Sequence, residues 1–81
     1  MDSDDARKVL ITIGRNIKAE RARAGLRQDE VAHRAELGVA QYARLERGET
    51  DSGITKYVRV AQALEVELAV LLTGIDLARG H

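Results

Sequence analysis

The chain has 81 residues, and its 13 Lys and Arg balance its 13 Asp and Glu, so the formal net charge at pH 7 is zero. This length suits one small domain and excludes two, and the absence of Cys excludes disulfides and thiol chemistry. Phe and Trp are also absent, so Leu, Ile, Val and Ala must fill the core, which favours an all-helical bundle over a sheet.

The charges are unevenly distributed along the chain. Residues 1–24 carry six cations against four acids, whereas residues 48–81 carry three cations against five acids. A local basic face can bind phosphate in a neutral protein, so a nucleic-acid interpretation depends on where the cations lie. No apolar run approaches the roughly 18 residues of a membrane span, and no signal peptide is visible. We therefore expect a cytoplasmic protein that does not enter a membrane.

The first helical pattern follows an acidic start at residues 2–5. Ser3 or Asp4 suits the N-cap position, and the acids suit the positive end of the helix dipole. One helical face is then traced by Ala6, Leu10, Ile13, Ile17, Glu20, Arg21 and Ala24. Gly25 suits a left-handed C-cap. The pattern predicts either one long helix from about residue 4 to residue 24 or a helix broken at Gly14.

Two short helical patterns follow, separated by the turn Glu36-Leu37-Gly38. In residues 26–35 an apolar stripe is formed by Val31, Ala32 and Ala35. Residues 39–47 place on one face Val39, Tyr42, Leu45 and Glu46, and on the other Ala40, Arg44 and Arg47. The second helix, which ends at Gly48, thus has a narrow apolar base and an outward face of small and cationic residues. Two helices joined in this way, with the second presented outward, predict a helix-turn-helix unit.

Two further helices are predicted after an acidic loop at residues 49–53. Asp51, Ser52 or Gly53 suits the N-cap of the fourth helix, whose inward face is predicted to hold Ile54, Tyr57, Val58, Ala61 and Leu64. A turn at residues 65–66 leads into a fifth helix that closes at Gly74. Its inward positions are Leu68, Leu71, Leu72 and Ile75, and Val70 points outward. The chain is therefore predicted to fold as one all-α domain of five helices.

Several motifs occur in a set order along the chain. The central two are Leu26-x-Gln28-x-Glu30-Val31-Ala32 and Tyr42-x-x-Leu45-Glu46-Arg47-Gly48. Before them stand Ile13-Gly14-Arg15-x-Ile17 and Arg21-x-x-x-Gly25-Leu26, and after them Val60-Ala61-x-Ala63-Leu64-x-Val66-x-Leu68-x-x-Leu71-Leu72. Together they resemble the phage-repressor/Cro-type (XRE) helix-turn-helix family. The resemblance covers residues 13–74 and implies a compact repressor-like domain, with an N-terminal extension of the first helix at about residues 4–12 and a short tail at 76–81.

DNA contacts are expected at two groups of residues. The family resemblance places contacts to base edges on Val39, Ala40, Gln41 and Arg44. Of these, Gln41 is suited to adenine and Arg44 to guanine or to a phosphate, whereas the two apolar side chains can only contact groups such as a thymine methyl. Contacts to phosphates fall on Arg27, Gln28, Arg34 and Arg47. A solvated or protein-binding helix face is the alternative interpretation.

The sequence departs from the family pattern at several positions. Arg27 stands where Ser or Thr usually caps the second helix, and is free to face a phosphate. Glu36 stands at the usual glycine of the turn, so either it adopts a left-handed backbone or the turn differs slightly. Gly38 replaces the usual Ser or Thr cap but is a tolerable N-cap. The loop at residues 49–51 is acidic where many members are basic.

Arg21 and Glu46 are predicted to form a buried ion pair. Each lies on the inward side of its own helix, where an unpaired charge is costly. The resemblance implies a pair at these two positions, and bidentate geometry between a guanidinium and a carboxylate would satisfy both groups.

These observations predict a sequence-specific DNA-binding transcriptional regulator that reads the major groove with the helix at residues 39–47. A homodimer on a pseudo-palindromic site is expected, because a single module this small reads few bases. Its dimer patch is predicted to use the outward apolar residues Val66, Val70, Leu77 and Ile11. Stand-alone family members include controller proteins of restriction–modification systems, phage-type repressors and antitoxins.

A protein-interaction module, such as an antitoxin subunit or an adaptor, is the alternative, since the net charge is zero and the reading tip is apolar. An enzyme is not expected, because no nucleophile–base constellation is visible. No cofactor and no metal site are expected either, because the two histidines have no paired ligand spacing.

Overall fold

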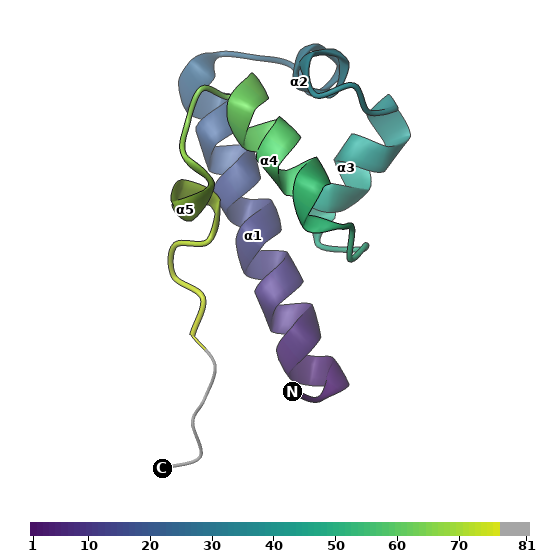
Figure 1. Ribbon diagram of the computed structural model, residues 1–81, viewed down its shortest axis with the longest axis vertical. Helices are drawn as coiled ribbons and strands as arrows, with labels where there is room; N and C mark the ends of the chain where they lie inside the picture. The colour runs from purple at the N-terminus through teal and green to yellow at the C-terminus, as the bar shows by residue number, and fades with distance from the viewer. Residues whose placement is uncertain (77–81) are drawn as a thin grey trace.

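A computed structural model describes residues 1–76, and five helices follow one another in this part of the chain. They are α1 (Ser3–Ala24), α2 (Gln28–Arg34), α3 (Val39–Arg47), α4 (Ile54–Ala63) and α5 (Leu68–Leu71). No strand occurs in these residues, so the predicted all-α, five-helix architecture is confirmed. In Figure 1, α1 runs the length of the domain and its first turns extend beyond the other helices.

The start and end of α1 follow from short-range hydrogen bonds. The N-cap is Asp2, whose Oδ1 accepts from the backbone N–H of Asp5 at 2.9 Å, so the prediction of Ser3 or Asp4 was one or two residues late. The helix ends at Gly25, which adopts the predicted left-handed conformation with φ of 69°. Between these caps the helix is continuous, and the alternative of a break at Gly14 is wrong.

Gly14 lies where α1 and α3 approach each other most closely. A Cβ atom at this position would lie 2.7 Å from the carbonyl oxygen of Leu45 and closer still to that of Glu46. Only a residue without a side chain lets the two backbones come this near. Gly14 therefore sets the distance at which α3 is held against α1.

Both turns that follow α2 and α4 use the same backbone arrangement. Glu36 and Glu65 have φ values of 59° and 58°, in the left-handed region that usually favours glycine. After each, the next residue donates back to the helix: Leu37 to Ala32 and Val66 to Ala61. The sequence left open whether Glu36 would be left-handed, and the structure has it so.

The core is built mainly from aliphatic residues and two tyrosines. Its buried members are Ile13, Ile17, Val31, Ala32, Ala35, Leu37, Tyr42, Leu45, Tyr57, Val60, Ala61, Ala63, Leu64 and Leu71. Around this core α1 contacts α3 and α5, while α2 contacts α3 and α4 (Figure 1). Within residues 1–76, no helix combines the length and the apolar character needed to span a membrane.

Three predictions for α4 and α5 need correction. Ile54 was predicted to point inward but is 59% exposed, because it is the first residue of α4 and lies at the edge of the packed region. Val60 is fully buried and was not predicted to be. Leu72, also predicted inward, is 37% exposed because α5 ends at Leu71 rather than near Gly74.

The end of α5 is held by long-range hydrogen bonds. The side-chain amide of Asn16 on α1 donates to the carbonyl oxygens of Leu71 at 2.9 Å and Thr73 at 2.7 Å. These bonds occupy carbonyls at the end of α5 and anchor the segment after it to α1. The N-cap of α4 is Gly53, one of the three residues the sequence offered.

Candidate nucleic-acid interface

The helix-turn-helix is formed by α2, the turn at residues 35–38 and α3. Val31 and Ala32 on α2 are fully buried, and Leu37 in the turn is 9% exposed and fills the space between the helices. The first turn of α2 is capped by the carboxylate of Glu30, which accepts from the backbone N–H of Arg27 at 2.8 Å. This bond is one half of a capping box; the other half, a side-chain oxygen at residue 27 that accepts from the first turn of the helix, is missing because arginine has no acceptor.

One face of α3 is buried and the other is presented to solvent. Tyr42, Leu45 and Glu46 are buried, as the helical pattern predicted. Val39 was grouped with them but is 48% exposed, because it is the first residue of the helix and lies at its open end. The presented residues are Val39, Ala40, Arg44 and Arg47, with Gln41 half-buried beside them. Of the four residues predicted to contact bases, Val39, Ala40 and Arg44 are exposed and Gln41 is partly covered.

A hydrogen-bond network centred on Glu46 fixes the orientation of α3. Arg21 on α1 donates to both carboxylate oxygens, from Nε at 2.5 Å and from Nη2 at 3.1 Å. Gln28 on α2 donates from Nε2 to Oε1 at 3.0 Å, and the hydroxyl of Tyr42 donates to Oε2 at 2.6 Å. The structure therefore contains the expected ion pair and adds two further donors. One carboxylate from α3 is held by side chains from α1, α2 and α3 itself.

The network is also electrostatically complementary. Burial by itself would raise the pKa of Glu46, but the hydrogen bonds from Arg21, Tyr42 and Gln28 outweigh it and lower that pKa. Burial and the neighbouring Glu46 carboxylate raise the pKa of the Tyr42 hydroxyl, so this group remains a donor. Arg21 also donates from Nη1 to the carbonyl oxygen of Leu26 at 3.1 Å, which ties the link between α1 and α2 to the same network.

The four residues predicted to contact phosphates differ in their surroundings. Arg27 is paired with Asp29 at 3.0 Å and lies 3.7 Å from Glu30, and Arg47 is paired with Glu49 at 2.8 Å. Gln28 donates its side-chain amide to Glu46 and so braces α3 against α2.

Two of the arginines expected to contact DNA lack an ion-pair partner among the described residues. Arg34 and Arg44 are exposed, and neither forms an ion pair within residues 1–76.

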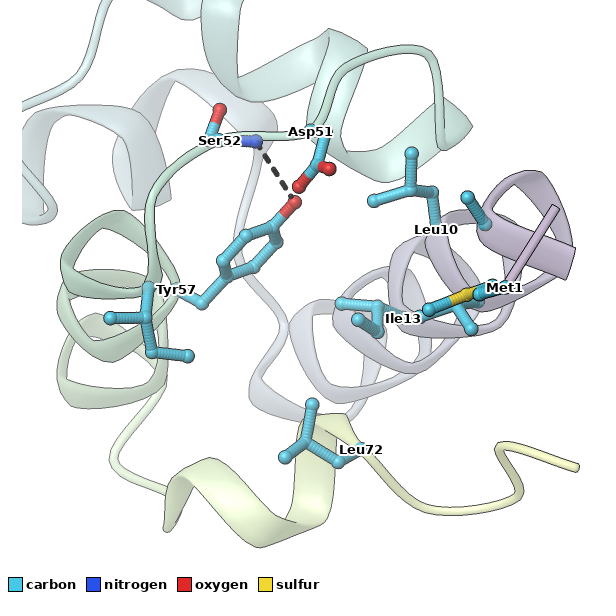
Figure 2. A pocket seen from close by; sticks show the side chains of 10 residues that line it. Met1, Leu10, Ile13, Asp51, Ser52, Tyr57 and Leu72 are labelled. Atoms are coloured by element: carbon cyan, nitrogen blue, oxygen red, sulfur yellow. Dashed lines mark hydrogen bonds between the residues drawn. The ribbon is translucent and has the colours of Figure 1, made fainter. Parts of the chain in front are cut away.

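An apolar groove of about 340 Å³ lies apart from the helix-turn-helix, as none of its lining residues belongs to α2 or α3. Figure 2 shows Leu10 and Ile13 of α1 facing Tyr57 of α4 across it, with Leu72 on a third side. The hydroxyl of Tyr57 accepts from the backbone N–H of Ser52 at 3.4 Å. The groove is open, and its rim includes exposed Met1 and Ile54.

The residues predicted for a dimer patch differ in how much of their side chain is exposed. Val70 is 36% exposed, Val66 packs partly against the core, and Ile11 is half-buried where the backbone of Gly48 lies against it. Leu77 lies outside the described residues. Within residues 1–76, no three or more His, Asp or Glu side chains are grouped as metal ligands.

Comparison with known proteins identifies the family. Residues 17–71 match the family described as helix-turn-helix, which is more than half of the chain. The chain belongs to the XRE-type helix-turn-helix family. A search of curated protein sequences gives no match.

A structural neighbour of this helix-turn-helix protein is the restriction-modification controller protein C.AhdI from Aeromonas hydrophila. The two are similar with a TM-score of 0.74 and 26% sequence identity, over 76% of this chain and 94% of that chain. Family and fold are those of DNA-binding transcriptional regulators and not of enzymes, which supports the same broad function here.

Proposed function

We propose that this helix-turn-helix protein is a sequence-specific transcriptional regulator that inserts α3 into the major groove of DNA. The observation that carries the proposal is the division of α3 into a locked face and a presented face. Glu46 on the locked face accepts four hydrogen bonds from three side chains. A helix held this firmly presents Gln41 and Arg44 in a fixed orientation, as base recognition requires.

Direct readout rests on a small set of polar groups. Arg44 is exposed and forms no ion pair in the described residues, so its guanidinium is free to bond to the O6 and N7 atoms of guanine. Gln41 is suited to adenine, and Val39 and Ala40 to the thymine methyl group. Arg34, at the end of α2, is the phosphate contact with the least competition.

A homodimer would give the domain a longer site. Two copies that place their α3 helices about 34 Å apart would read two half-sites of a pseudo-palindrome, one turn of DNA apart. Of the patch assigned from the sequence, Val70 is the exposed member within the described residues, and Leu72 beside it is also exposed. Ile11 and Val66 contribute less surface, and Leu77 completes the set assigned from the sequence.

Duplex binding measured by fluorescence anisotropy at several salt concentrations tests the proposal. Arg44→Ala should lose both affinity and sequence preference, whereas Arg44→Lys should retain the salt dependence but lose the preference, because lysine lacks the bidentate fork. Binding that does not weaken as salt rises would contradict a DNA regulator. It would favour a module that binds another protein through the apolar tip at Val39 and Ala40.

A further inference from the structure

Glu49 is held by backbone contacts at the junction of α1 and α3. It follows Gly48, the left-handed C-cap of α3, and its backbone N–H donates to the carbonyl oxygen of Arg44 at 3.0 Å. Gly48 lies so close to α1 that a Cβ there would be 2.7 Å from the Cα atom of Ile11. The position of Glu49 is therefore fixed by the fold, whatever its side chain does.

Arg47 binds this carboxylate directly, and cations of both helices act on it. Arg47 donates from Nε to Oε2 of Glu49 at 2.8 Å. Arg44 lies one turn before Arg47 on α3, and Arg7 lies one turn before Ile11, the residue that Gly48 packs against, on the same face of α1. The hydrogen bond from Arg47 lowers the pKa of Glu49, and the charges of Arg47, Arg44 and Arg7 act in the same direction. The carboxylate thus has one bonded guanidinium partner and lies in the positive field of both helices.

The geometry points to Glu49 as an internal substitute for a DNA phosphate: in the free protein its carboxylate occupies the place that a backbone phosphate takes between Arg47 of α3 and Arg7 of α1. Guanidinium groups bind carboxylates and phosphates with the same planar fork, so one can replace the other. The inference rests on the proposed function. It adds Arg7 as a DNA contact, although Arg7 lies outside residues 17–71, which match the family.

Exchange of the carboxylate for a phosphate costs little free energy, because the Arg47–Glu49 ion pair is exposed to solvent. The side chains of Arg47 and Glu49 are 55% and 51% exposed. Exposed pairs of this kind stabilise a protein little, so a phosphate can displace the carboxylate. Glu49 then reduces affinity for every duplex by a similar factor, which disfavours non-specific binding without abolishing specific binding.

A random-sequence 30-base-pair duplex is the appropriate probe, since phosphate contacts carry no sequence information. The variant is Glu49→Gln, and the matched control is Asp51→Asn, an exposed acid in the same loop that forms no ion pair within residues 1–76. Dissociation constants of the full chain are measured between low and physiological salt. A thermal melt verifies that each variant is folded.

Glu49→Gln should tighten binding by about two- to fivefold, the change expected when an exposed pair no longer has to be broken. The slope of affinity against salt should change little, because the phosphate displaces the carboxylate in the wild-type chain too, so both proteins neutralise the same phosphates. Asp51→Asn should not tighten binding, and the gain from Glu49→Gln should shrink when Arg7→Gln is added.

Two results would overturn the inference while leaving the proposed function intact. One is equal tightening by Glu49→Gln and Asp51→Asn, which would reflect only the loss of a negative charge. The other is a gain that Arg7→Gln leaves unchanged. A folded wild-type chain and a folded Glu49→Gln variant that both fail to bind any duplex would refute the proposed function and this inference together.

Discussion

Replacing Glu46 by alanine should destabilise the fold strongly, although Glu46 is a charged residue and not part of the apolar core. Glu46→Ala leaves four donor groups without their acceptor, from Arg21, Gln28 and Tyr42. The residue is 8% exposed, so water has little access to replace the lost carboxylate. The orientation of α3 relative to α1 and α2 depends on the same bonds.

The free energy of unfolding lost in Glu46→Ala depends on the donors that lose their acceptor. Removing one partner of a buried ion pair typically costs about 3–5 kcal/mol, and an unsatisfied buried hydroxyl about 1–3 kcal/mol. Arg21 lowers the total, since its side chain is 18% exposed and it keeps its bond to the carbonyl oxygen of Leu26. We therefore expect a loss of about 3 kcal/mol, which corresponds to a fall in Tm of about 12–24 °C for a domain of this size.

Thermal and urea unfolding followed by circular dichroism will measure this loss. Glu49→Ala is the control, because it also removes a carboxylate paired with arginine, but from an exposed site where little stability is at stake. The double variant Arg21→Met/Glu46→Leu should recover much of the loss, since apolar replacement of both partners removes the stranded charge. A Tm for Glu46→Ala no lower than that of Glu49→Ala would refute the reasoning.

Three further predictions concern stability. Gly14→Ala should destabilise the chain by about 1–3 kcal/mol in urea unfolding, because the added methyl group meets the carbonyl oxygen of Leu45 at 2.7 Å; an unchanged midpoint would mean that α1 and α3 can separate freely. Glu36→Gly and Glu65→Gly should each stabilise it by about 0.5 kcal/mol, because relief of the left-handed strain exceeds the entropy cost of glycine, and a lower Tm in either variant would speak against strain at that turn. The pKa of Glu46 is lower in the folded chain than its unfolded value of about 4.3, so its charge stabilises the fold above that pH and the contribution is lost as pH falls. Urea midpoints between pH 6 and pH 3 should therefore decline less steeply for Glu46→Gln than for the wild-type chain. Parallel declines would contradict the lowered pKa.

The ion pair and the helix-turn-helix could be predicted because their signals are local or come in matching pairs. Arg21 and Glu46 are opposite charges at inward helical positions, and such charges must be paired. Gly25 and Gly48 both mark helix ends, where a left-handed residue is needed, and both adopt that conformation. Even the unusual Glu36 could be suspected from its place in the turn.

The remaining features depend on contacts between residues far apart in the sequence. From the sequence alone, Gly14 suggests a break in a helix. Its role in letting α1 and α3 pack closely is visible only where the two helices cross. From the sequence Asn16 is only a polar residue in a helix, yet its side-chain amide donates to the carbonyl oxygen of Leu71, 55 positions away, at the end of α5. The ion-pair partners of Arg27 and Arg47 are only two residues away in the sequence. Helical periodicity does not predict such pairs, because each one lies across the end of a helix.

Selection of bound DNA from a random duplex pool at near-physiological salt tests the central claim most directly. The account predicts enrichment of a two-fold motif whose half-sites lie about 34 Å apart, one turn of DNA. The motif should be lost or blurred for Arg44→Ala, whose fold is expected to be intact because Arg44 is exposed. No enrichment by the folded wild-type chain would contradict a sequence-specific DNA reader and would favour a module that binds another protein.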